Sequence, residues 1–195
     1  AFQLIEALGF VARGEASQQI EGLTKADRKA LASAGFRIGR FAIWAPVLMR
    51  GRALKARRLL WRLNGGVSFR PSKRALALTK PKDMGEFSAL ALHGFVAIGP
   101  QMIRAEAAER LAATAYARAA KGPFPIDDAL AATTKLSAAD MPQVLAAIGF
   151  RAVKQEEGET LYRRGPYRDT TKKSSAARPK RKPKLPQKLP PIQKD

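Results

Sequence analysis

Two consecutive helices are predicted by residues 127–149, which read DDALAATTKLSAADMPQVLAAIG. Asp127 is a suitable N-cap for the first helix, and Ser137 or Asp140 begins the second. In the second helix an apolar stripe recurs at the spacing of one helical face. Its members are Met141, Val144, Leu145 and Ile148. Gly149 ends this helix.

The flanking segments complete the order of a winged helix. A long Ala-rich helix is expected over residues 103–120, with Glu106 and Arg110 supporting each other at i,i+4. Residues 124–126 read as a short strand. Residues 150–155 and 160–164 are expected to pair as a hairpin around an acidic tip. Helix, short strand, helix, helix and hairpin is the order found in a winged helix.

The N-terminal part is predicted to be mostly helical. A short helix over residues 2–8 is followed by a Gly-containing linker to residue 22. Thr24 and Asp27 form a capping box for a helix that stops at Gly35. Residues 36–45 read as extended, and residues 52–63 as an amphipathic helix. The apolar positions of that helix share one face and are Ala56, Leu59, Leu60 and Leu63. Residues 67–86 are expected to form a loop.

We therefore expect a mainly α protein in three parts. These are a basic helical module (residues 1–86), a winged-helix-like α+β module (87–167) and a tail (168–195). Nine Lys or Arg and five Pro fall between Lys172 and Lys194. Such a segment buries too little apolar surface to offset chain entropy, so we expect the tail to be disordered.

The charge distribution points to a polyanionic partner. The net charge is +20 and the isoelectric point is about 11.0. Between Asp27 and Asp83 lie fifteen Lys and Arg residues and no Asp or Glu. Such a one-sign block needs an external counter-charge, and interleaved aromatic residues are typical of nucleic-acid binding. The alternative is a solvated basic face with core aromatics between the cations.

The candidate nucleic-acid contacts come from this block and from the tail. They are Arg37, Arg40, Arg50, Arg52, Lys55, Arg57, Arg58, Trp61, Arg62, Lys73, Arg74, Lys180, Arg181 and Lys182. Each phosphate that they neutralise should contribute a salt slope of about −0.7 to −0.9. No sequence specificity is expected, and the residues alone leave RNA, DNA and anionic lipid open.

Signatures of catalysis are few. The chain has no Cys, and His93 is its only histidine, so thiolate metal sites and a zinc pair of histidines are excluded. No phosphate-binding loop of the Gly-x-x-x-x-Gly-Lys-Ser/Thr type occurs. We expect no catalytic residue, no metal ligand and no cofactor in this segment. The longest nearly apolar run has nine residues, too few to span a bilayer, and we expect no membrane partner.

The winged-helix-like module is poorly suited to reading DNA. Its second helix carries no Lys or Arg from Ala138 to Ile148, and its hairpin tip carries three glutamates. Base readout needs donors directed into the major groove. We therefore expect this module to pack against a neighbouring domain or a protein partner.

Several motifs resemble a stretch downstream of the motor in bacterial superfamily two DExH helicases, similar to the mitochondrial degradosome RNA helicase. The residues that carry the resemblance are Leu23-Thr24-Lys25-Ala26-Asp27-Arg28-Lys29-Ala30-Leu31, Gly35-Phe36-Arg37-Ile38-Gly39-Arg40-Phe41, Pro46-Val47-Leu48, Leu59-Leu60-Trp61, Gly94-Phe95-Val96-Ala97-Ile98-Gly99-Pro100, Arg104 and Glu109-Arg110-Leu111. The resemblance covers roughly residues 20 to 150.

The resemblance implies a C-terminal accessory region that grips single-stranded or unwound RNA behind two RecA-like motor domains. ATP and Mg²⁺ would belong to that motor, and an exoribonuclease is an implied partner. RNA is thus favoured over DNA, and we expect a cytoplasmic protein. Two alternatives stay open: a stand-alone basic protein of ribosomal or chromatin type, and a winged-helix module that docks a protein.

Overall fold

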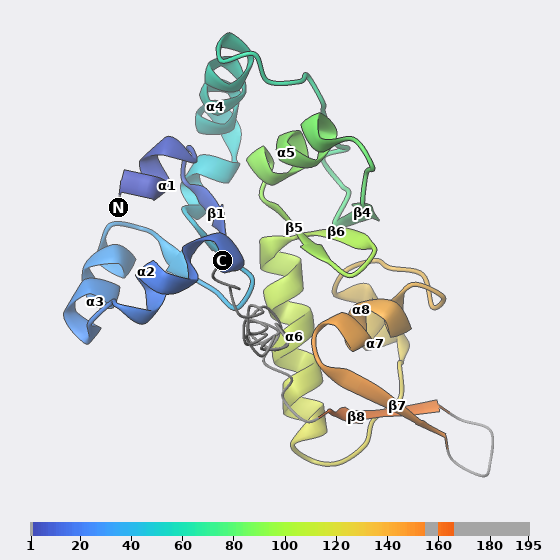
Figure 1. The fold of residues 1–195 in the computed structure, drawn as a ribbon. Helices are drawn as coiled ribbons and strands as arrows, with labels where there is room; N and C mark the ends of the chain where they lie inside the picture. Colours follow the sequence, from blue (N-terminus) through green and yellow to red (C-terminus); the bar gives the residue numbers. More distant parts are fainter. Residues whose placement is uncertain (1, 155–159, 166–195) are drawn as a thin grey trace, which may run out of the picture.

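Helices and small antiparallel sheets alternate along the chain. The computed structural model describes residues 2–154 and 160–165 (Figure 1). Strands from both halves of the sequence form antiparallel sheets in this part of the chain, so the architecture is mixed α and β. The prediction of a mainly α protein is not confirmed. The predicted tail, residues 168–195, lies outside the described residues.

The N-terminal sheet has the order β1-β3-β2 and is antiparallel throughout. The elements of this part are α1 (Phe2–Glu6), β1 (Phe10–Ala12), the 3-10 helix η1 (Arg13–Ala16), α2 (Ser17–Glu21), α3 (Lys25–Ser33), β2 (Arg37–Ile38) and β3 (Ala42–Trp44). In the register, Phe10 lies opposite Trp44, and Ile38 opposite Ile43. β1 and α2 occupy the predicted linker, because such short elements leave no periodic pattern in the sequence.

The capping box of α3 is confirmed. The backbone N–H of Asp27 donates to the Thr24 hydroxyl at 3.2 Å, and the Thr24 N–H donates to the Asp27 carboxylate at 2.9 Å. Gly35 follows the helix with a φ of +83°, a conformation that favours glycine. No residue of α3 is buried. The helix therefore depends on this local cap more than on core packing.

A second sheet lies in the middle of the chain with the order β4-β6-β5. Its elements are β4 (Ala77–Thr79), α5 (Met84–Leu92), β5 (Phe95–Ile98) and β6 (Gln101–Arg104). β4 falls within the predicted loop, and α5 runs across the predicted module boundary at residue 86.

The C-terminal elements follow the predicted order. They are α6 (Ala105–Ala119), α7 (Asp128–Ala132), α8 (Met141–Ala147), β7 (Phe150–Lys154) and β8 (Thr160–Arg164). Asp127 caps α7 by accepting the Leu130 N–H at 2.8 Å. Phe124 forms a β-bridge with Tyr162, which adds a third extended segment beside the hairpin. The α8 stripe is buried as predicted.

The main hydrophobic core joins both halves of the chain. It contains Phe10, Ala42 and Trp44 together with residues of α6, α8 and the C-terminal hairpin. The α6 face in this core is made largely of alanines, which are small enough for the N-terminal sheet to approach closely. The two predicted modules therefore share one core in the described part of the chain.

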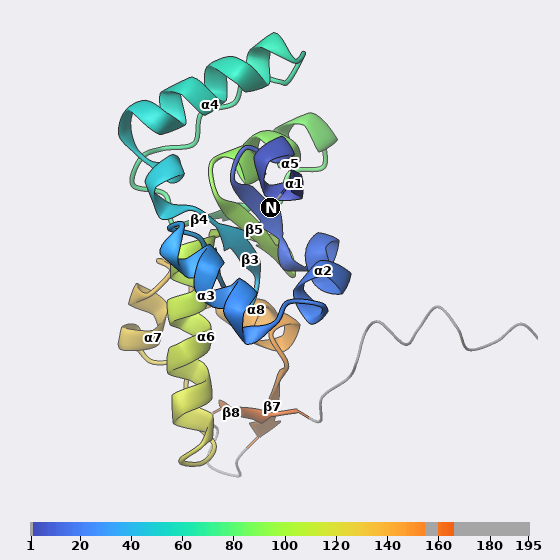
Figure 2. The same ribbon diagram turned by 90° about the vertical axis from the view of Figure 1, so that its left-hand side faces the viewer.

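α4 (Gly51–Leu63) extends from the rest of the molecule after the 3-10 helix η2 (Pro46–Met49). Figures 1 and 2 show it at the opposite end from β7 and β8. The helix itself was predicted, but its predicted apolar face is exposed: Leu63, for example, is 73% exposed. The face turned to the body is centred on Arg57, which is buried. Helical periodicity thus identified the helix but not the side that packs.

Gly39 gives a test of the contact between the β2–β3 hairpin and α6. A Cβ at this position would collide with the Glu109 carboxylate and the Trp44 ring. We expect Gly39→Ala to lower the free energy of unfolding by about 1–3 kcal/mol, because overpacking forces neighbouring groups to shift. Gly14→Ala is the control, since no atom of the described residues outside its immediate chain neighbours lies within 4 Å of its added Cβ. Equal unfolding midpoints for the two variants in urea would contradict this packing.

Candidate nucleic-acid interface

The return loop after α4 folds back onto the helix and gathers cations there. Asn64 and Gly65 end the helix, Gly65 with a φ of +77°. The Trp61 Nε1–H then donates to the Val67 carbonyl at 3.0 Å. Gly66 lies so close to the Trp61 ring that a Cβ would collide with it. This hydrogen bond and this close approach hold residues 66–70 against α4.

Arg58, Arg62 and Arg70 form the resulting cationic cluster, which we call the α4 cluster. The pKa of Arg58 is lowered first by burial and then by the positive charges of Arg70 and Arg62. Arg62 and Arg70 are exposed, and Arg58 is half-buried. No member of the cluster has an acidic partner among the residues that the structure describes. An anion placed here would relieve the repulsion between these cations.

Arg57, next to Arg58 in α4, lies in the interior instead of on the surface. It was predicted as a nucleic-acid contact, but only 4% of the residue is exposed. Its Nη1–H donates to the Leu48 carbonyl at 3.3 Å, and Nη1 lies 3.0 Å from the Met49 sulfur. Nε and Nη2 have no hydrogen-bond partner among the described residues. Burial lowers the pKa of Arg57 to about 10.

His93 occupies the same buried layer at the end of α5. It is 4% exposed, and its Nε2 has no hydrogen-bond partner within the described part of the chain. Its pKa is lowered to about 4, chiefly by burial and further by the charges of Arg58, Arg104 and Arg57. The imidazole is therefore neutral near pH 7. A neutral ring beside these cations avoids adding another positive charge to the interior.

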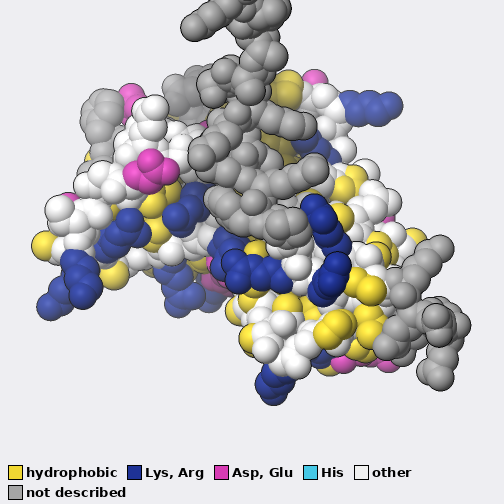
Figure 3. Space-filling model, turned by 60° about the horizontal axis from the view of Figure 1, so that its bottom comes forward, with side chains coloured by type: hydrophobic (Ala, Val, Ile, Leu, Met, Phe, Trp, Pro, Cys, Tyr) yellow, Lys and Arg dark blue, Asp and Glu magenta, His cyan; other side chains and the backbone are white. Residues whose placement is uncertain are grey.

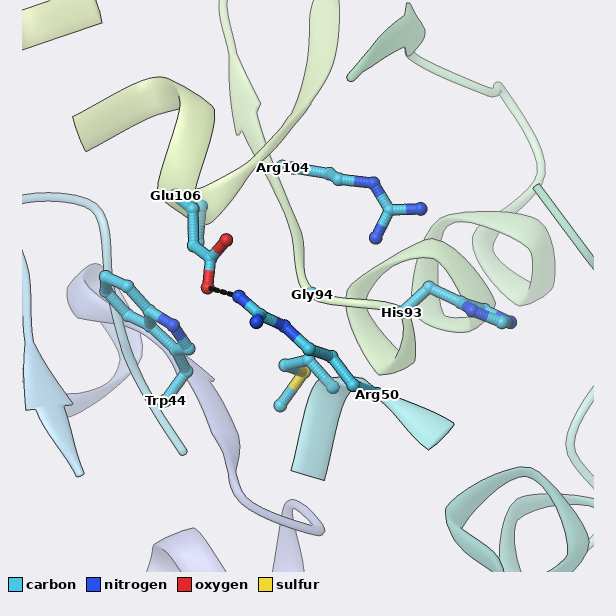
Figure 4. Close-up of a pocket in the computed structure, with 8 residues that line it drawn as sticks. Trp44, Arg50, His93, Gly94, Arg104 and Glu106 are labelled. Carbon is cyan, nitrogen blue, oxygen red and sulfur yellow. Dashed lines mark hydrogen bonds and ion pairs between the residues drawn. The ribbon is translucent and has the colours of Figure 1, made fainter. Parts of the chain in front are cut away.

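Arg50 has an internal counter-charge. Its Nη2 lies 2.8 Å from a Glu106 carboxylate oxygen, and Figure 4 shows this pair across a cavity of about 60 Å³. Glu106 had been predicted to pair with Arg110 along α6; the structure instead gives it a partner 56 positions away in the sequence. Trp44 and His93 also line this cavity, and the Trp44 indole N–H has no hydrogen-bond partner in residues 2–154 and 160–165.

Arg37 and Arg40 lie apart from the α4 cluster, on the β2–β3 hairpin. Arg37 lines a groove of about 580 Å³ together with Arg13 and Arg28. The Arg40 guanidinium stacks over the Tyr116 ring of α6 at 4.1 Å from its centroid. Arg13 was not among the predicted contacts, because it precedes the acid-free block, and no pattern in the sequence indicates that it lies beside Arg37.

The remaining predicted nucleic-acid contacts fall into an exposed group and a group outside the described residues. Arg52, Lys55, Lys73 and Arg74 are exposed. Lys180, Arg181 and Lys182 lie outside the described residues. The acid-free block therefore does not form one surface. The α4 cluster lies at one end of the molecule, whereas Arg40 lies over Tyr116 of α6, a helix that runs towards β7 and β8 at the other end (Figure 2).

Comparison with known proteins gives no relative. No protein-family model, curated protein or solved structure matches the chain. The helicase resemblance thus rests on the sequence motifs quoted above. Within residues 2–154 and 160–165, no helix has the length and apolar character needed to cross a membrane.

Replacement of Arg57 tests whether its buried charge stabilises or destabilises the folded protein. We expect Arg57→Met to leave the free energy of unfolding unchanged or to raise it by about 1–2 kcal/mol, because an apolar side chain removes an unpaired buried charge. Arg62→Met, at an exposed position, should change it by less than about 0.5 kcal/mol. Urea denaturation measures both. A loss above about 1 kcal/mol for Arg57→Met would contradict this expectation.

The depressed pKa of His93 predicts a stability change in mild acid. The folded pKa of about 4 lies below the ordinary value of 6.5. The unfolded chain then binds more protons between these values, so stability is complete above pH 6.5 and falls as the pH drops towards 4. The loss should be on the order of 3 kcal/mol. In denaturant titrations, His93→Gln should remove this part of the pH dependence; identical slopes in both proteins would refute it.

Proposed function

We propose that this chain binds RNA without sequence specificity, as the C-terminal accessory region of an ATP-dependent RNA helicase. The observation that carries the binding proposal is the α4 cluster, in which three arginines lie together without an acidic partner among the described residues. Guanidinium groups present paired donors that match phosphate oxygens. The choice of a helicase, and of RNA over DNA, rests on the motif resemblance.

The α4 cluster supports backbone recognition more than base reading. Arg58 and Arg62 are one helical turn apart, and Arg70 is brought to them by the Trp61–Val67 hydrogen bond. The Trp61 indole N–H is thereby occupied, and its ring is half-buried. The cations are thus the groups available to a strand. A protein that follows a moving strand needs contacts of this sequence-independent kind.

We also propose a winged-helix arrangement for residues 105–164. The order α6, Phe124 bridge, α7, α8 and the β7–β8 hairpin supports it. α8 carries no Lys or Arg, which argues for packing against protein more than entry into a major groove. The neighbouring partners in this proposal are RecA-like motor domains in the same polypeptide, which would hold ATP and Mg²⁺, and an exoribonuclease. The proposed location is the cytoplasm.

Titration of a fluorescent single-stranded RNA tests the binding proposal. We expect Arg58→Gln/Arg62→Gln/Arg70→Gln to weaken binding and to reduce the salt slope by up to about 2, because each lost phosphate contact removes about 0.7. The matched control removes three exposed charges elsewhere, as Lys25→Gln/Lys29→Gln/Lys121→Gln. Anisotropy at several salt concentrations gives both quantities. Absent RNA binding, or equal losses in both variants, would end the proposal.

The helicase part of the proposal has a separate test. An upstream open reading frame that encodes Walker motifs supports an accessory region, whereas a start codon close upstream supports a stand-alone basic protein. A pull-down with residues 1–167 addresses the third possibility, a module that docks a protein. Recovery of a partner that RNase treatment does not release would favour it.

A further inference from the structure

Two arginines from distant parts of the sequence lie against one aromatic ring. Arg40 lies in the β2–β3 turn, Tyr116 on α6 and Arg164 at the end of β8. The Arg40 and Arg164 guanidinium carbons lie 4.1 and 5.4 Å from the centroid of the Tyr116 ring. The two cations are therefore no farther apart than the sum of these distances.

The Tyr116 ring is held in place from behind. Its hydroxyl donates to the Ile148 carbonyl at 2.9 Å, and its ring packs against Phe150 with centroids 5.0 Å apart. Phe150 belongs to the main core. The ring is thus a fixed support, and the two guanidinium groups gain cation–π energy from lying on it.

The β2–β3 turn is anchored on both sides of Arg40. The Phe41 N–H donates to the Glu109 carboxylate at 3.0 Å, and Arg13 donates to the Gly39 carbonyl at 2.7 Å. Next to Arg164, the Gly165 N–H donates to the Gly149 carbonyl at 2.8 Å. These bonds limit the backbone freedom at both arginines. Little conformational entropy would then be lost when a ligand binds.

Both arginines are exposed, and neither forms an ion pair within the part of the chain that the structure describes. Two like charges held at the same rigid ring repel each other. A phosphate group would relieve this repulsion and would accept paired hydrogen bonds from both guanidinium groups. Figure 3 shows Lys and Arg side chains near the middle of the face that it displays, between the part with α2 and α3 and the part with β7 and β8.

We propose that Arg40 and Arg164 form one phosphate-binding site, supported by Tyr116, for the backbone of an RNA strand. The site rests on the proposed RNA-binding function and adds to it a second contact region, away from the α4 cluster. It uses the C-terminal hairpin, whose acidic tip had argued against nucleic-acid contact. A strand bound here touches the N-terminal and C-terminal halves at once.

The test measures RNA affinity for Arg40→Gln, Arg164→Gln and the double variant by fluorescence anisotropy. Each single change should weaken binding by about fivefold, the upper range for an exposed charge pair. The double variant should lose less than the product of the single effects, because both groups hold the same phosphate. The control is Arg163→Gln, an exposed arginine one position along the same strand, which should change affinity by less than twofold.

Variants of Tyr116 test its role as a positioning residue. Tyr116→Phe keeps the ring and should retain affinity, whereas Tyr116→Leu removes the support and should weaken binding as much as one arginine change. Thermal unfolding of both variants separates this effect from misfolding. Equal RNA affinities for the Phe and Leu variants, at equal folded fractions, would overturn the role of the ring.

The remaining outcomes distinguish this site from the proposed function. If the α4 cluster variant weakens RNA binding but the Arg40 and Arg164 variants do not, this site is refuted and the proposed function stands. If the wild-type chain binds no RNA, both fail. Calorimetry with inorganic phosphate is a further experiment. If the wild-type chain binds phosphate saturably and the double variant does not, while the double variant keeps its RNA affinity, the site binds free phosphate and the RNA proposal for it is overturned.

Discussion

One side of α6 holds the segment from Arg40 to Arg50 in place, and the two halves of the chain depend on this contact. Glu106, Glu109 and Tyr116 are spaced so that they share one face of the helix. Glu106 pairs with Arg50, Glu109 accepts the Phe41 N–H, and Tyr116 supports Arg40. Beneath these polar contacts, Ala42 and Trp44 enter the main core.

This contact changes the meaning of the acid-free block. Within the block, a uniform positive charge implied that every counter-charge must come from outside the protein. Glu106 and Glu109 lie beyond the block, yet they reach its middle through the fold. Several basic residues still lack an acidic partner among the described residues, and those that lie close to other cations are divided: the α4 cluster at one end, and Arg40 and Arg164 at the Tyr116 ring of α6. An extended anion that touches both groups would suit this arrangement better than a compact one.

Local sequence patterns predicted many of the helices and strands, and the elements that were missed or misplaced share one cause: they depend on partners elsewhere in the chain. The α3 capping box, the α8 stripe and the β7–β8 hairpin depend on neighbours within a few residues, so local sequence patterns predict them. β1 and β4 have three residues each, and they exist because β3 and β6 offer partners elsewhere in the chain. α4 shows the limit most clearly. Its leucines have helical spacing, yet the packed face is the one that carries Arg57, because the attachment through η2 decides which side meets the body.

The sequence alone determined which helices have strong caps, that the chain is positively charged and that it has no thiolate. These properties depend only on residue types and on short-range spacing. Tertiary structure alone decided which cations lie together. Arg57 is withdrawn into the interior, Arg50 is neutralised by Glu106, and Arg40 and Arg164, 124 positions apart in the sequence, lie against the same Tyr116 ring. Electrostatic interactions fall with distance in space, not along the sequence, and only the folded chain sets those distances.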